Sequence, residues 1–140
     1  MFKKSTALII VLILFIFACG NSPTFPTDQS LVGSWHWYLS IGGNLGQQTP
    51  EMCNCEYWYT FYTDGTFEYH FDDELIQSGE YEVRQEFSEF FNRTVNNLYL
   101  NEIVTPFDYN GDILIFLNPR LCLSCPDSVY FSRDPRVFDE

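Results

Sequence analysis

The sequence predicts an all-β domain, an eight-stranded antiparallel barrel of the up-and-down type. After Ser30, apolar and polar residues alternate over short stretches with the two-residue period of a β-strand. Turn-forming residues such as Asp64-Gly65 separate these stretches. None of the intervening segments has the helical spacing that a crossover between parallel strands would need. Eight short strands joined by hairpin loops can close edge to edge around a small interior.

The expected strands follow one another along the chain. In the first, Trp35 and Trp37 alternate with His36 and Tyr38, so one face is heavier than the other. The glycine-rich segment 42–54 has no periodicity and is expected to be a long loop over one end of the barrel. Segment 85–96 lacks regular spacing and is expected to be an irregular strand, and 106–111 is expected to be a turn. The eight predicted strands are 32–41, 55–63, 66–71, 75–84, 85–96, 97–104, 112–117 and 128–133.

The N-terminal segment predicts export. Lys3 and Lys4 precede an uncharged apolar run that is shorter than the ~20 residues needed to span a membrane, which is typical of a secretory signal. Residues 16–19, Ile-Phe-Ala-Cys, are similar to a bacterial lipobox, which implies a signal peptide over residues 1–18 and a lipid on Cys19. A plain signal peptide or an uncleaved anchor is the alternative. Residues 19–30 are expected to form a flexible tether and residues 31–140 a single domain.

The net charge restricts the class of partner. The chain carries a formal charge of −12 at pH 7, and removal of Lys3 and Lys4 would make it more negative. Such a surface repels phosphates and anionic lipid headgroups, so we expect no nucleic-acid binding and no electrostatic docking to membranes. Attachment to the membrane is expected through the lipid on Cys19.

Several short motifs together resemble a known family. Leu31-Val32-Gly33-Ser34-Trp35, Thr63-Asp64-Gly65-Thr66 and Ser78-Gly79-Glu80-Tyr81, in this order, resemble the lipocalin-like lipoproteins of Bacteroidetes-type bacteria. The resemblance implies a lipocalin-like barrel with Gly33 and Trp35 at one end and Arg133 of the last strand stacked on the indole as a seal. A second lipocalin motif late in the barrel has no counterpart. The resemblance also implies a location in the bacterial cell envelope, at the outer membrane and facing the periplasm or the cell surface.

Four further cysteines form two close pairs, Cys53-x-Cys55 and Cys122-x-x-Cys125. In an up-and-down barrel the loops that hold them lie at the same end. An exported protein meets an oxidising compartment, which favours disulfides over a four-thiolate zinc site. Bonds between the two loops are expected rather than two local bridges, because Cys-x-Cys closes a strained ring. No metal and no other cofactor is expected.

The aromatic content of 19% predicts an interior lined by rings. We expect a small apolar ligand to bind there, at the end that holds the cysteines. The alternative is a packed barrel that serves as a structural or protein-interaction module of the envelope. No catalytic constellation is evident, so the chain is not expected to be an enzyme, and His36 and His70 are expected on the outer surface. The residues expected to line the cavity are Trp37, Tyr57, Tyr59, Phe67, Tyr69, Tyr81, Ile115 and Phe131.

Overall fold

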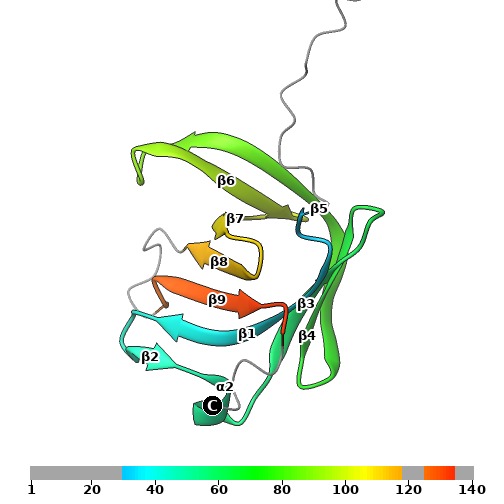
Figure 1. Cartoon of the computed structure of the whole chain (residues 1–140), viewed down its shortest axis with the longest axis vertical. Coiled ribbons are helices and arrows are strands. Elements are labelled where there is room, and N and C mark those ends of the chain that lie inside the picture. The colour runs from blue at the N-terminus through cyan, green and yellow to red at the C-terminus, as the bar shows by residue number, and fades with distance from the viewer. Residues whose placement is uncertain (1–29, 118–124, 135–140) are drawn as a thin grey trace, which may run out of the picture.

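The computed structural model describes residues 30–117 and 125–134 of the 140-residue chain (Figure 1). The predicted signal peptide, Cys19 and Cys122 lie outside the described residues. The elements are β1 (Gly33–Ile41), β2 (Gln47–Gln48), α2 (Pro50–Cys53), β3 (Tyr57–Phe61), β4 (Thr66–Phe71), β5 (Glu74–Ser88), β6 (Arg93–Leu100), β7 (Ile103–Tyr109), β8 (Ile113–Leu117) and β9 (Ser128–Ser132).

These strands close into an eight-stranded antiparallel barrel, as the alternation of the sequence predicts. From β3 to β9 each strand pairs with the next one in the chain, and β1 pairs with both β3 and β9. The two-residue strand β2 lies outside this ring and pairs only with the end of β1. Among the described residues, no helix has both the length and the apolar character that crossing a membrane requires.

The prediction was wrong about the strands between residues 85 and 111. β5 continues to Ser88, and residues 89–92 form a hairpin turn in which Asn92 has a φ of 49°. A second turn at residues 101–102, with Asn101 at a φ of 53°, divides the predicted strand 97–104 between β6 and β7. Asparagine tolerates this left-handed region better than most residues, and both turns follow from that property. Most of the predicted turn 106–111 is therefore the second half of β7.

A β-bulge in β1 changes which side chains face the interior. The pairing of β1 with β9 shifts register between Trp37 and Leu39. A bulge inserts one extra residue, so the alternation reverses beyond it. Ser40 is consequently only 3% exposed, although simple alternation places it on the outer face with His36.

The interior is filled mainly by aromatic side chains. Tyr59 lies between Tyr69, at a ring-centroid distance of 4.7 Å, and Phe131, at 5.5 Å. Phe131 also contacts Phe116 at 4.8 Å. Edge-to-face and stacked contacts of this kind add to the free energy gained by burial alone. The buried core cluster consists of Leu31, Trp35, Trp37, Phe61, Phe67, Tyr81, Leu98, Leu100, Phe107, Leu114, Phe116 and Phe131.

One end of the barrel is closed by Arg133 and Trp35. The guanidinium carbon of Arg133 lies 4.2 Å from the centroid of the indole, which is the contact that the lipocalin resemblance implies. Its three nitrogens donate hydrogen bonds to the carbonyl oxygens of Gly111, Val32 and Ser30 at 3.2, 2.8 and 2.6 Å. The guanidinium therefore joins the chain before β1 to the turn between β7 and β8.

The indole of Trp35 and the backbone of Gly33 complete this end. Trp35 Nε1 donates a 2.7 Å hydrogen bond to the carbonyl oxygen of the fully buried Leu31. Gly33 has a φ of +120°, and a Cβ atom there would lie 2.9 Å from Nη1 of Arg133. Glycine is required at this position for two reasons, because the backbone conformation is unfavourable for other residues and because the guanidinium occupies the space.

We expect Gly33→Ala to lower the free energy of unfolding by about 2 kcal/mol or more, since it adds a steric clash to backbone strain. Gly65→Ala is the matched control, because Gly65 has a φ of +83° and open space where a Cβ atom would lie, with no contact closer than 4 Å beyond its chain neighbours. That control should lose only about 1 kcal/mol. Urea denaturation followed by circular dichroism measures both, and equal losses would contradict the role given to the Arg133 contact.

Candidate functional site

A pocket of about 300 Å³ opens beside Trp37, on the β1 segment that runs away from the Arg133 end. The pocket lies between the barrel interior, the β2 and α2 segment, and the chain that precedes β9. Most of its wall is apolar, with a few hydroxyl and amide groups. The lining residues are Trp37, Ser40, Gln48, Thr49, Met52, Cys53, Cys55, Tyr57 and Pro126.

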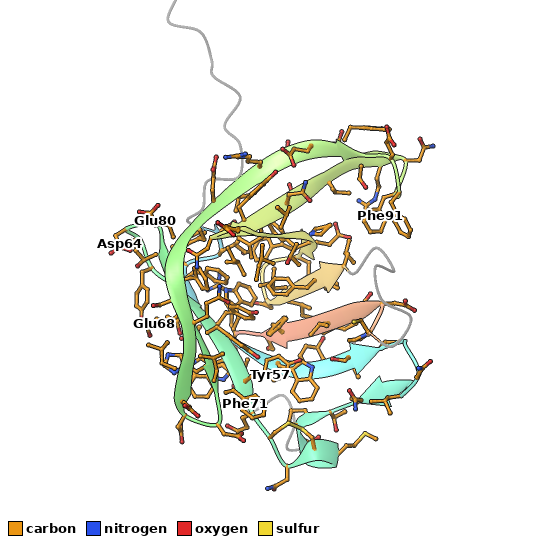
Figure 2. The ribbon with its side chains drawn as sticks, turned by 180° about the vertical axis from the view of Figure 1, so that it is seen from behind. Tyr57, Asp64, Glu68, Phe71, Glu80 and Phe91 are labelled. Atoms are coloured by element: carbon orange, nitrogen blue, oxygen red, sulfur yellow. A yellow bond between two sulfur atoms is a disulfide. The ribbon has the colours of Figure 1, made fainter. Side chains whose placement is uncertain are left out.

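Two stacked rings form the aromatic part of the pocket. Trp37 and Tyr57 have a centroid distance of 4.5 Å and an interplanar angle of 9°. Trp37 Nε1 donates a 2.9 Å hydrogen bond to Oγ of Ser40, which fixes the indole. Tyr57 in turn stacks on Phe71 of β4 at 6.5 Å, and Figure 2 shows both labelled rings close together at this end of the molecule. The register of β1, β3 and β4 therefore produces a row of rings that leads from the pocket to the rim.

The side wall is held by a local disulfide between Cys53 and Cys55. The expectation of bonds between the two cysteine loops was wrong for these two residues. Cys53 ends α2, and Asn54 has a left-handed conformation with φ 51° and ψ 47° that reverses the chain. The Cα atoms of the two cysteines are thereby brought to 5.2 Å, within the usual range for a disulfide. The bond also removes these two thiols from the alternative four-thiolate zinc site.

Burial changes the titration of the tyrosines near this end. Desolvation raises the pKa of Tyr57, and a hydrogen bond with Ser40 acts in the opposite direction. Desolvation also raises the pKa of Tyr59, with a further contribution from neighbouring Tyr69. Both hydroxyls therefore stay neutral at physiological pH, and that of Tyr57 gives the pocket a hydrogen-bonding group without charge.

The structure separates the eight residues that were expected to line a cavity. Trp37 and Tyr57 line the pocket. Five others, Tyr59, Phe67, Tyr69, Tyr81 and Phe131, pack in or against the core cluster. The expectation for Ile115 was wrong, because its neighbours Leu114 and Phe116 face the interior and strand alternation puts Ile115 on the outer face. Residues 112–117 are almost all apolar, so the alternation of the sequence does not show which of them face the interior.

Sequence reasoning missed five lining residues, Ser40, Gln48, Thr49, Met52 and Pro126. Ser40 faces the pocket only because of the bulge in β1. Gln48, Thr49 and Met52 belong to the long loop after β1, whose lack of periodicity conceals the short strand β2 and the helix α2. Pro126 belongs to the chain that precedes β9. The one available signal was the length of the loop after β1 together with its two cysteines.

An acidic hollow lies next to the pocket and shares Cys55 with it. This hollow has a volume of about 520 Å³ and includes Glu51, Glu56, Asp72 and Asp73. Asp72 accepts a 2.8 Å hydrogen bond from the backbone N–H of Glu56, which ties the β4–β5 turn to the start of β3. In the described part of the chain, no three His, Cys, Asp or Glu side chains gather in a way that could hold a metal ion.

His36 and His70 lie on either side of Trp58 across three strands. The ring of His70 is stacked on the indole at 4.9 Å, and that of His36 at 5.9 Å. Desolvation lowers the pKa of His36, while the charge of Glu56 acts in the opposite direction. His70 Nε2 lies 3.0 Å from a carboxylate oxygen of Glu68. Because the indole separates the two imidazoles, they cannot bind one metal ion together.

We expect the double substitution Cys53→Ser and Cys55→Ser to lower the free energy of unfolding by only about 1 to 2 kcal/mol, because the bond closes a very short loop. Urea denaturation of the oxidised protein and of the variant provides the comparison. A loss of about 4 kcal/mol would instead indicate a bond that closes a long loop.

Tyr59→Phe is expected to reduce the sensitivity of the fold to alkaline pH. Since the pKa of Tyr59 in the folded protein lies above its ordinary value near 10, its contribution to stability is complete below pH 10 and is lost as the pH rises further. The variant lacks this titration, so its free energy of unfolding should fall less steeply above pH 10. Urea denaturation at a series of pH values measures the slope, and an unchanged slope would contradict the assignment.

Comparison of the chain with protein-family models, with curated proteins and with solved structures finds no match.

Proposed function

We propose that the chain is a lipid-anchored, lipocalin-like protein of the bacterial cell envelope. Its barrel binds a small apolar ligand in the pocket beside Trp37 and Tyr57. The pocket itself is the observation that carries this proposal, because it combines an aromatic wall with a few neutral polar groups. The contact of Arg133 with Trp35 at the other end supports the family resemblance. The lipobox-like residues before Cys19 support attachment to a membrane.

The size and chemistry of the pocket restrict the ligand. A volume of about 300 Å³ is at the lower limit of small-molecule sites, so the ligand is small or inserts only one part of itself. The rings of Trp37 and Tyr57 give the pocket an apolar surface, so they favour an aromatic or aliphatic group of the ligand. Gln48 and Thr49 provide an amide and a hydroxyl that can hydrogen-bond one polar group of the ligand.

The experiment uses the full chain carrying Cys19→Ser, so that no attached lipid competes, and the neutral fluorescent probe N-phenyl-1-naphthylamine. Met52→Glu places a carboxylate at the pocket wall, where an apolar ligand would have to desolvate it. Leu45→Glu is the matched control, because both side chains are 70% exposed and Leu45 does not line the pocket.

We expect Met52→Glu to weaken probe binding at least about tenfold, and Leu45→Glu to leave the affinity within about twofold of the parent. A fluorescence titration at fixed protein concentration gives the dissociation constants. If both variants bind as tightly as the parent, the probe binds elsewhere and the assignment of this pocket is wrong.

A second function, a structural or protein-interaction module, is favoured by the packing of the interior. Tyr59, Phe116 and Phe131 contact one another through their rings in the interior of the barrel. A packed barrel can act as a rigid support without any ligand. If the parent protein binds neither the probe nor lipid extracted from bacterial envelopes, this function replaces the first.

A further inference from the structure

Strand β5 has an edge with no neighbouring strand among the residues that the structure describes. Residues 74–80 pair with β4, whereas β6 pairs only with residues 81–88. The side of residues 74–79 that faces away from β4 is therefore open. In Figure 1, β5 runs from the β4–β5 hairpin into a long arch, and β6 follows only the arch.

The direction of the backbone groups shows which of them are available at this edge. Tyr81 donates its N–H to the carbonyl oxygen of Gly65, on the β4 side. Glu80 faces the other way, because its carbonyl oxygen accepts from the N–H of Asn101 at 3.1 Å. In an antiparallel ladder these directions alternate, so the N–H and C=O of Ser78 point to the open edge as well.

Asn101 already pairs with this edge as one residue of an added strand would. Its side-chain nitrogen donates to the carbonyl oxygen of Ser78 at 3.3 Å, and its side-chain oxygen accepts from the N–H of Glu80 at 3.2 Å. Gly79 permits this approach, because a Cβ atom there would collide with the Asn101 amide. The N–H of Ser78 and the backbone of residues 74–76 remain outside this contact.

Two of the side chains at the open edge are apolar and exposed. Leu75 and Ile76 are 51% and 52% exposed, and Ile76 is the extra residue of the bulge in the pairing of β5 with β4. Proteins usually protect an unpaired strand edge with lysine, proline, a covering loop or a β-bulge. This edge has a bulge at Ile76, but residues 74–79 contain no lysine or proline. An edge that carries exposed aliphatic residues instead is suited to accept another strand.

The charged residues beside the open edge determine which kind of polypeptide can bind there. A hollow of about 570 Å³ continues from Gly79 along β5 and includes Glu80 and Glu82. Arg84 is the basic residue of this hollow, and Glu82 already binds it through two hydrogen bonds of 2.8 and 2.6 Å. A second copy of this chain, with the same acidic residues and a net charge of −12, would be repelled.

We propose that the open edge of β5, from Glu74 to Ser78, binds an extended, basic polypeptide segment of another protein by strand addition. The segment pairs with the N–H of Ser78, places alternate apolar side chains on Leu75 and Ile76, and directs lysine or arginine toward Glu80, since Glu82 is already bound by Arg84. This interaction uses the outer wall of the barrel and does not depend on the pocket beside Trp37.

The test uses two substitutions at one position. Ser78→Pro removes the N–H at the open edge and leaves the bonds to β4, since proline is tolerated on an edge strand when its nitrogen faces outward. Ser78→Ala keeps the N–H and removes only the hydroxyl. The probe is a blocked seven-residue peptide of alternating lysine and valine, and its binding to the full chain carrying Cys19→Ser is measured by fluorescence anisotropy.

We expect the parent and Ser78→Ala to bind this peptide equally, and Ser78→Pro to bind at least about tenfold more weakly, because strand addition depends on main-chain hydrogen bonds. Circular dichroism and a thermal melt establish that both variants are folded. If Ser78→Pro does not fold, a probe with N-methyl groups on alternate residues replaces it, since this probe keeps the charge and loses the hydrogen bonds.

Three results would overturn the proposal. Equal binding of the methylated and unmethylated peptides would indicate electrostatic adsorption only. Equal binding of an alternating glutamate and valine peptide would contradict the charge argument. A dimer of the parent in sedimentation equilibrium that Ser78→Pro dissociates would show that the edge pairs with a second copy of the chain.

Discussion

The closure of the barrel through β1 is the constraint on which the rest of the structure depends. β1 uses its first residues to pair with β3 and its later residues to pair with β9, so a single strand joins the two ends of the sheet. Arg133 strengthens this junction by binding the chain before β1, the turn between β7 and β8, and the indole of Trp35. Each of these contacts connects segments far apart in the sequence, so they stabilise the closed form rather than any one hairpin.

The way in which rings fill the barrel decides where a ligand can bind. Around Tyr59 the rings of Tyr69, Phe116 and Phe131 are in contact with it across the interior. Space remains near Trp37, where the bulge turns the small Ser40 inward and the β2 and α2 segment stands away from the wall. The proposed pocket is thus a consequence of one extra residue in β1 and one long loop.

The sequence predicted the elements that depend on short-range patterns. The predictions were wrong where contacts between distant residues determine the structure. Alternation and the Asp64-Gly65 turn were sufficient for the β3–β4 hairpin. The same reasoning placed an irregular strand over 85–96 and a regular strand over 97–104, because the asparagine turns at Asn92 and Asn101 lack a following glycine. Ring strain favoured bonds between the loops over the local disulfide of Cys53, but the left-handed conformation of Asn54 brings the Cα atoms of Cys53 and Cys55 to 5.2 Å.

The amino-acid sequence by itself determined the all-β class, the eight-stranded closure and the aromatic interior, because two-residue periodicity and ring content are properties of the chain alone. Tertiary structure decided the rest. The side on which Ser40 and Ile115 lie depends on a bulge and on pairing partners that local sequence does not encode. The open edge of β5 exists because β6 ends its pairing at Tyr81, a register that is set by the tilt of strands around the whole barrel.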